Sequence, residues 1–177
     1  ERSFRMAWKL LREEPEIIAN LSEALYLNGK LNEAGAIVIT RSDSAVCMNQ
    51  LGKLYGYEKR FVDAVDAFAS ATRLDESDVN YLENLAAAYI EADMIHQAEE
   101  LLAQLIESGA NASRYNLMGH VALAKGETIR AEMAYTEALK IEPDNQVIAC
   151  NLVELYIRFM NLDSARNAWD RFLSKST

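Results

Sequence analysis

The sequence contains little of what interrupts or crosslinks a chain, with 2 prolines, 7 glycines and 2 cysteines among 177 residues. Proline and glycine are the two residues that most destabilise a helix interior, so their scarcity favours helix throughout. No segment alternates strictly between polar and apolar residues, as a half-buried strand does. The sequence therefore predicts an all-α protein.

Basic residues are also few. The sequence has 18 Lys and Arg and 27 Asp and Glu, which gives a net charge of -9. Nucleic-acid binding depends on clustered cations that neutralise phosphates, and this balance argues against it. The one basic cluster, at Arg2, Arg5, Lys9 and Arg12, has helical spacing and fits the solvated side of an amphipathic helix. We expect no nucleic-acid partner.

Long hydrophobic runs are absent, because no stretch approaches the roughly 18 apolar residues of a membrane span. No signal peptide is visible, but the chain starts at Glu1 without a methionine, so we expect a fragment of a longer protein. Direct membrane insertion is not expected. The compartment stays open between the cytoplasm, which we slightly favour, and the periplasm.

Residues typical of catalysis are equally sparse. The 2 histidines, His96 and His120, lie far apart, and no HExxH, CxxC or GxxxxGK[ST] string occurs. No serine has an identifiable base and orienting group. We therefore expect no enzymatic activity, no metal and no cofactor.

What the chain does contain is a repeat. Alanine recurs at intervals of 30, 34, 33 and 34 residues, each time with a large apolar residue 13 positions before it and another four positions after it. The alanines are Ala34, Ala64, Ala98, Ala131 and Ala165; the residues before them are Leu21, Leu51, Leu85, Met118 and Leu152; those after them are Val38, Phe68, Leu102, Tyr135 and Trp169. This period is typical of an array of helical hairpins.

Small and large residues within each repeat predict how its two helices pack. In the second repeat, Gly52 and Ala64 allow close approach of two backbones, and Tyr55 and Phe68 fill the wider space. Turns are expected at 28–29, 58–60, 91–93, 126 and 161, and helix caps at Asp43 or Ser44, Asp78, Asn111 and Asp144. The first repeat is about four residues short, so its second helix should end early, near residues 40–43.

The two cysteines, Cys47 and Cys150, fall about a hundred positions apart, in distant repeats. Each repeat of such an array touches only its neighbours, so the two thiols should not meet. We expect both to be small core residues and not a disulfide.

The pattern resembles the tetratricopeptide repeat (TPR) family over nearly the whole chain. The fourth repeat carries the family's residues most closely, in Gly119, Ala131, Tyr135, Ala138 and the ending "KIEPDN". The resemblance implies an all-α, right-handed superhelical solenoid of about five helix-turn-helix repeats plus an N-terminal orphan helix. It also implies one TPR domain over 1–177, made of an orphan second helix at 1–14 and repeats at 15–44, 45–78, 79–111, 112–145 and 146–177.

The family resemblance implies a scaffold that binds a protein or peptide in a concave groove lined by the first helix of each repeat. Carried over position by position, the groove residues are Asn20, Asn49, Gln50, Lys53, Asn80, Glu83, Asn84, Asn116, His120 and Asn151. Carboxamides suit a peptide backbone, because each has donors and an acceptor. The alternative stays open that these asparagines bond within the hairpin. The family's carboxylate clamp for chaperone tails is not matched, since Asn80 and Asn84 stand where it needs Lys and Arg.

The last predicted helix carries Trp169 and Phe172 and lacks the polar outer face that usually closes such an array. This favours a second hypothesis, in which the chain is a structural module of a larger assembly, for instance an envelope secretion complex. In that case the chain would act through its exposed ends, and those ends would allow self-association.

Overall fold

The computed structural model describes residues 14–172, which form ten α-helices and no strand. The helices are α2 (Pro15–Leu27), α3 (Leu31–Ile39), α4 (Ala45–Tyr57), α5 (Phe61–Leu74), α6 (Val79–Glu91), α7 (Ile95–Ser108), α8 (Ala112–Ala124), α9 (Thr128–Ile141), α10 (Gln146–Arg158) and α11 (Leu162–Phe172). The all-α prediction is confirmed. The orphan helix predicted for 1–14 lies outside the described residues, apart from residue 14.

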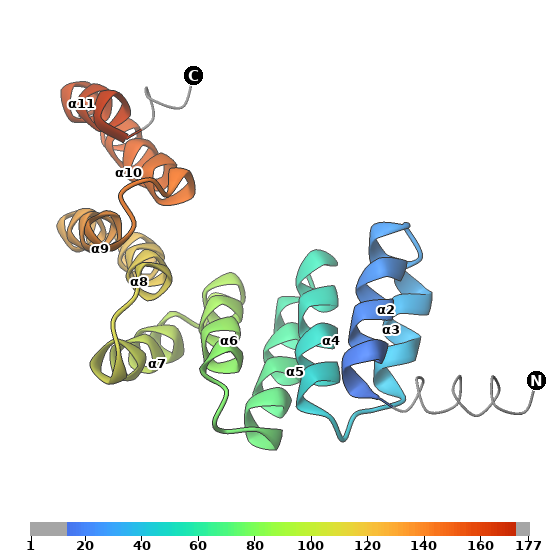
Figure 1. Ribbon diagram of the computed structural model, residues 1–177. Coiled ribbons are helices and arrows are strands. Elements are labelled where there is room, and N and C mark those ends of the chain that lie inside the picture. The colour runs from blue at the N-terminus through green and yellow to red at the C-terminus, as the bar shows by residue number, and fades with distance from the viewer. Residues whose placement is uncertain (1–13, 173–177) are drawn as a thin grey trace, which may run out of the picture. The chain divides into compact units, whose positions relative to one another are not determined.

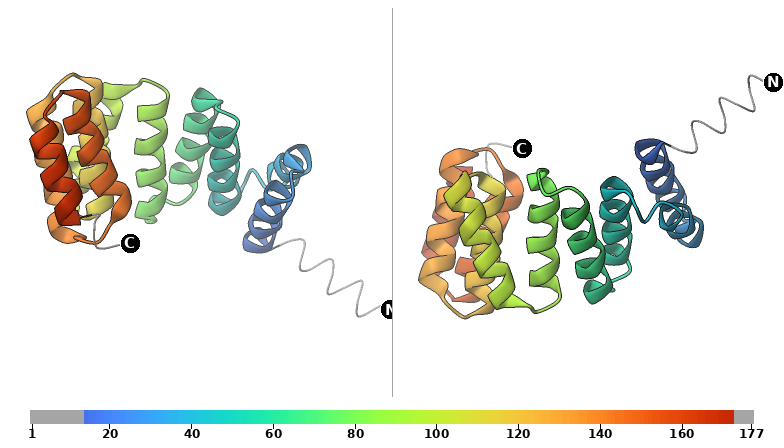
Figure 2. Two further views of the ribbon diagram at one scale, coloured as in Figure 1. Left: turned by 90° about the horizontal axis from the view of Figure 1, so that it is seen from above. Right: turned by 90° about the horizontal axis from the view of Figure 1, so that it is seen from below.

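The chain divides into two compact units, 1–93 and 94–177, and the boundary falls in the turn of the third repeat. In the first unit, α4 packs on α2, α3 and α5, and α6 packs on α5 (Figure 1). In the second unit, α8 packs on α7 and α9, and α10 packs on α9 and α11 (Figure 2). Within each unit, the described helices follow the repeat: the first helix of one hairpin covers the second helix of the hairpin before it.

Each hairpin turns at a residue in the left-handed region. These residues are Gly29 (φ 75°), Lys59 (φ 59°), Asp93 (φ 58°), Gly126 (φ 74°) and Met160 (φ 57°). They recur at nearly the same intervals as the alanines, so the turn is part of the repeat. In four of the turns the next N–H donates to a carbonyl five residues earlier, as in Asn161 to Tyr156 at 2.8 Å, which satisfies the end of the first helix.

Three of the four predicted caps are confirmed. The side chains of Ser44, Asp78 and Asn111 accept from backbone N–H groups at the start of α4, α6 and α8. The fourth is wrong, because α10 begins at Gln146 and the residue before it is Asn145. The Asn145 Oδ1 accepts from the Ile148 N–H at 3.2 Å, while Asp144 lies one residue too early.

The short first repeat behaves as predicted, since α3 has 9 residues and α5 has 14. The core prediction for Cys150 is wrong, and Leu21 is not buried as its equivalents Leu51, Leu85 and Leu152 are. Leu21 is 42% exposed, because no described helix covers that side of α2. Cys150 is exposed while Cys47 is buried, because Cys150 occupies a place on α10 that is polar in three of the other repeats; both thiols are free.

In the second and fourth repeats the glycine of the first helix receives the aromatic ring 16 positions later. A Cβ at Gly52 would lie 2.7 Å from the Phe68 ring, and one at Gly119 would overlap the Tyr135 ring. Both aromatic residues are buried as a result. In the first repeat this place holds Ser22, whose hydroxyl donates to the Ala34 carbonyl at 2.9 Å. In these hairpins the two helices therefore approach closely at the small residue of the first helix, as the sequence predicts.

Candidate functional site

A bonded pair of carboxamides joins the first helices of two consecutive repeats in the first unit. The Asn84 Nδ2 on α6 donates to the Asn49 Oδ1 on α4 at 2.8 Å. Both side chains are partly buried. The bond leaves Asn84 with its carbonyl oxygen and one N–H, and Asn49 with its whole amino group, so the pair can still bond a ligand.

The second unit repeats this pair and extends it. The Asn151 Nδ2 on α10 donates to the Asn116 Oδ1 on α8 at 2.8 Å and lies 3.3 Å from the His120 Nε2. The His120 Nδ1 is 3.4 Å from the Tyr135 hydroxyl, and the two rings meet edge to face. Burial raises the pKa of Tyr135 to about 12, so its hydroxyl keeps its proton at neutral pH.

The pairing follows the repeat spacing. In both pairs the donor lies 35 residues after its acceptor, which is one repeat plus one position. Elsewhere one of the two places lacks an amide: Gln50 would need a partner at Ala19, which has no polar side chain, and Leu117 occupies the donor place of the fourth repeat. The paired asparagines therefore bond between neighbouring repeats and not inside one hairpin.

The other predicted groove residues differ in their surroundings. Asn20 and Lys53 are exposed, and Glu83 is partly buried. Asn80 is exposed and its Nδ2 donates to the Asp78 carboxylate at 2.7 Å, at the start of α6. Gln50 is only 4% exposed, so its side chain faces the interior of the first unit. The structure thus brings Asn49 together with Asn84 in the first unit, and Asn116 together with Asn151 and His120 in the second.

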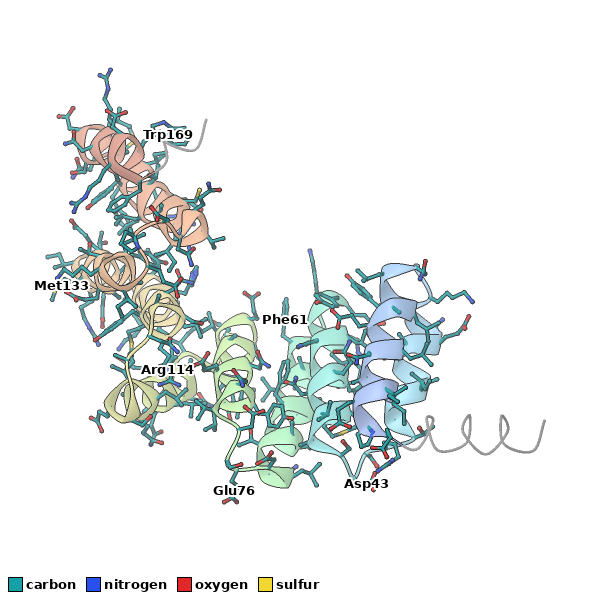
Figure 3. All side chains as sticks on the ribbon, in the orientation of Figure 1. Asp43, Phe61, Glu76, Arg114, Met133 and Trp169 are labelled. Atoms are coloured by element: carbon teal, nitrogen blue, oxygen red, sulfur yellow. The ribbon has the colours of Figure 1, made fainter. Side chains whose placement is uncertain are left out.

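Sequence reasoning did not single out two further features. Tyr57 stacks on Tyr26 with ring centroids 4.3 Å apart, which places an aromatic pair at the ends of α4 and α2. Arg114 is buried, and its guanidinium donates to the carbonyls of Leu105, at 2.7 Å, and Gly109 at the end of α7 (Figure 3). An arginine at a place that is apolar in the other repeats was the available signal for the second feature.

The predicted end residues differ from one another in burial. Trp169 is 53% exposed on α11 (Figure 3). Phe172 is partly buried and lines a cleft of about 720 Å³ together with Leu139, Pro143 and Arg171. Of the two, Trp169 is therefore the residue that the second unit presents to solvent.

No group of three or more His, Cys, Asp or Glu side chains among residues 14–172 is arranged to hold a metal ion. No helix in the same range combines the length and apolarity that crossing a bilayer requires.

Comparisons with known proteins agree on one family. A family model of the tetratricopeptide repeat matches residues 112–145, the fourth repeat. A TPR repeat-containing protein of Treponema pallidum (strain Nichols) is 24% identical over 98% of this chain. The chain spans 23% of the length of that relative, and the match to a second curated relative covers 18% of that protein.

Solved structures match the fold over most of the chain. A tetratricopeptide repeat protein from Parabacteroides merdae has a TM-score of 0.77 at 15% identity, covering 90% of this chain and 67% of its own. YrrB, described as a TPR protein with an unusual peptide-binding site, has a TM-score of 0.65 at 18% identity, covering 95% of this chain and 89% of its own. At these identities the likeness shows the fold.

Proposed function

The chain is a tetratricopeptide repeat protein, and from this we propose that it is a protein–protein interaction scaffold that binds an extended segment of a partner protein along its first helices. Repeats of this kind are generally interaction scaffolds and not enzymes. The bonded amide pairs, Asn49 with Asn84 and Asn116 with Asn151, are the observation that carries the proposal.

The amide pairs suit a peptide backbone because their mutual hydrogen bonds leave further donors and acceptors available. Each pair keeps a carbonyl oxygen and several N–H groups, which match the N–H and C=O of an extended segment. A polar group that remains partly exposed can exchange water for such a ligand at little cost. One pair in each unit would therefore hold backbone, and the side chains of the partner would be recognised by the residues around it.

Order in the unbound site supports the same proposal. The Asn151 amide contacts both Asn116 and His120, so its orientation is set before a ligand arrives. Groups that are already ordered lose less conformational entropy on binding. The amide pairs thus act as preformed contacts and not as mobile side chains.

The charges on the first helices favour a neutral or basic partner segment. Exposed carboxylates outnumber exposed cations on the described first helices; the carboxylates are Glu16, Glu23, Glu91 and Glu154, and the cations are Lys53 and Arg158. The whole chain carries a net charge of -9. Like charges repel during encounter, so an acidic segment would associate slowly. The fold can hold a peptide, as the described peptide-binding site of YrrB illustrates.

The experiment starts from peptides selected from a displayed random library on the wild-type chain. Their affinities are then measured by calorimetry for Asn84→Ala in the first unit and Asn151→Ala in the second. We expect one or both variants to lose about fivefold in affinity, since a net hydrogen bond contributes about 1 kcal/mol. Helicity and melting temperature, measured in parallel, show whether the repeats remain folded.

The matched control is Gln104→Ala, which removes an exposed carboxamide from the second helix α7. It should leave every affinity unchanged. Selected peptides that bind Asn84→Ala and Asn151→Ala as tightly as wild type would contradict the proposal.

A second candidate function is favoured by the exposure of Trp169. In this alternative the chain is a structural module of a larger assembly and acts through its ends. The indole offers a large apolar contact that a partner could bury, and tryptophan is enriched among residues that dominate binding energy. An envelope secretion complex is one assembly of this kind.

A further inference from the structure

His120 contacts a polar group of the second unit with each of its ring nitrogens. Its Nε2 lies 3.3 Å from the Asn151 Nδ2, and its Nδ1 lies 3.4 Å from the Tyr135 hydroxyl. The amino group of a carboxamide can only donate, so the Nε2 must accept and carries no proton. The Nδ1 then carries the ring proton and donates to the Tyr135 oxygen. This arrangement therefore requires a neutral imidazole.

The Asn151 amino group serves two acceptors at once. One N–H donates to the Asn116 Oδ1 at 2.8 Å, and the other is directed at the His120 Nε2. Protonation of the ring places a hydrogen on the Nε2, so that two donors face each other. The Asn151 side chain relieves this conflict if its oxygen and nitrogen exchange places. Its Oδ1 then accepts from His120, and Asn116 must turn as well and donate through its Nδ2.

We propose that protonation of His120 reverses the hydrogen bond between Asn116 and Asn151, and that peptide binding by the second unit depends on pH for this reason. With a neutral ring, the pair offers a ligand the Asn151 Oδ1 and the Asn116 Nδ2. With a protonated ring, it offers the Asn151 Nδ2 and the Asn116 Oδ1 instead. This inference rests on the proposed function and describes the regulation of the same site.

The first unit provides an internal control. Asn84 donates to Asn49 at the same distance of 2.8 Å and the same spacing of 35 residues. The place of His120, four residues after the accepting asparagine, is held there by Lys53. Lys53 is exposed, and an ammonium group has donors only. Acid removes no acceptor at this place, so the bond between Asn49 and Asn84 should keep its direction.

The helices that contact α8 include groups whose charge bears on the ring. Burial raises the pKa of Tyr135 on α9 to about 12, so this neighbour stays uncharged. Glu154 and Arg158 on α10 act on Tyr135 in opposite directions, and they pair with each other at 3.8 Å. Glu99 on α7 pairs with Lys125 at 2.8 Å. Imidazole ordinarily changes its protonation between about pH 5 and pH 8, and the reversal is expected in that range.

Nuclear magnetic resonance of the unbound chain tests the reversal without a ligand. An isotope-labelled sample is taken from about pH 8 to about pH 5, and the His120 ring signals report its protonation. The side-chain amide signals of the paired asparagines report which amino group is protected from hydrogen exchange. Protection should move from the Asn151 amino group to that of Asn116 at the midpoint of the His120 titration. The Asn84 amino group should stay protected throughout.

Two variants isolate the role of the ring. His120→Gln offers a side-chain carbonyl as an acceptor that does not titrate in this range, so Asn151 should stay the protected donor at every pH. His96→Gln is the matched control, because it removes the other histidine of the chain from an exposed place on α7. It should leave the response of the wild-type chain unchanged.

Peptide affinity tests the consequence for binding. Peptides selected at about pH 8 that need Asn151 should bind about fivefold more weakly at about pH 5, the factor that corresponds to one net hydrogen bond. His120→Gln should remove this difference. Peptides that need Asn84 instead should show no such dependence on His120.

Three results would overturn the inference. Titration of His120 while the Asn151 amino group stays protected would show that the pair does not reverse. A ring that keeps one protonation state over the whole range would exclude the trigger. Reversal with an unchanged affinity of the peptides that need Asn151 would exclude the effect on binding. Failure of the proposed function is a separate outcome, in which no selected peptide needs Asn84 or Asn151 at any pH.

Discussion

The fourth and fifth hairpins share the length of their first helix and the backbone of their turn, but they differ in the burial of their aromatic residue. Their first helices, α8 and α10, each have 13 residues, and their turns each contain a left-handed residue. The fourth pairs Gly119 with a buried Tyr135, and the fifth pairs Val153 with an exposed Trp169. The sizes of two residues 16 positions apart therefore decide whether an aromatic ring closes a hairpin or stays exposed.

The two hairpins also differ at their polar positions. The fourth has Arg114 and Asn116 where the fifth has Ile148 and Cys150. Arg114 on α8 donates to the end of α7, and Asn116 accepts a hydrogen bond from Asn151 on α10. The fourth hairpin is thus bonded to α7 and to α10 through these two positions, which in the fifth hairpin hold residues without such side chains.

The largest expected effect comes from making the fourth hairpin resemble the fifth. Gly119→Ala puts a methyl group into the Tyr135 ring and should lower the free energy of unfolding by about 3 kcal/mol. Adding Tyr135→Leu copies the residues of the third repeat, Ala86 and Leu102, and should recover part of that loss. Urea unfolding measures both.

The control is the helical glycine Gly35, where an added Cβ meets nothing within 4 Å. Gly35→Ala should stabilise the chain by up to about 1 kcal/mol, because alanine favours helix. If Gly119→Ala were stabilising as well, the close contact between Gly119 and Tyr135 would be refuted.

The next effect concerns the buried guanidinium. Arg114→Met keeps much of the side-chain bulk but removes the donors to the Leu105 and Gly109 carbonyls, so we expect a loss of about 2 kcal/mol in urea unfolding. Arg158→Met, at an exposed arginine of the fifth hairpin, should change stability by less than about 0.5 kcal/mol. Equal effects of the two variants would contradict the anchoring role.

The turns should respond in opposite directions. Met160 has a left-handed backbone that glycine adopts more easily, so Met160→Gly should stabilise the chain by about 1 kcal/mol. Gly126→Ala should destabilise it by a similar amount at the equivalent place. Thermal melting checks both, and a change of the same sign would mean that the two turns are not equivalent.

The smallest effect is electrostatic. The hydrogen bond from Lys125, at 2.8 Å, lowers the pKa of Glu99 from its ordinary value of 4.5, and Arg130 adds to it. Because the folded pKa is lowered, this stability is present above the ordinary pKa and is lost as pH falls through the folded value. Glu99→Gln should cost about 0.5 kcal/mol at pH 7 and nothing in acid.

The matched control for this pH dependence is Glu100→Gln, which neutralises the adjacent exposed carboxylate on the same helix. It should give no such loss at pH 7. Chemical unfolding at several pH values compares the two variants.

The hairpins could be predicted from the sequence because the repeat imposes one spacing on many residues at once. The alanines, the aromatic residues and the small residues of the first helices indicated which surfaces pack, and the turn at Gly126 and the cap at Asn111 followed from local chemistry. The Asp144 cap failed because two adjacent residues could both cap a helix, and local preference does not choose between them.

The candidate site was harder to predict because its hydrogen bonds join side chains of two neighbouring repeats. Asn84 and Asn151 could be placed on the right helices, but their bonds to Asn49 and Asn116 required reading two repeats together at a spacing of 35. The exposure of Leu21 depends on a helix that would cover it, which the residues of α2 do not specify. The right-handed superhelix, the repeat boundaries and the single domain over 1–177 stay predictions.

The most direct test of the difference between the two hairpins is the fluorescence of Trp169 alone. In Trp8→Phe, which changes a residue outside the described range, Trp169 is the only remaining tryptophan. We predict emission typical of an exposed indole. Emission at short wavelength would show that the ring is buried in its own hairpin, and would contradict the account.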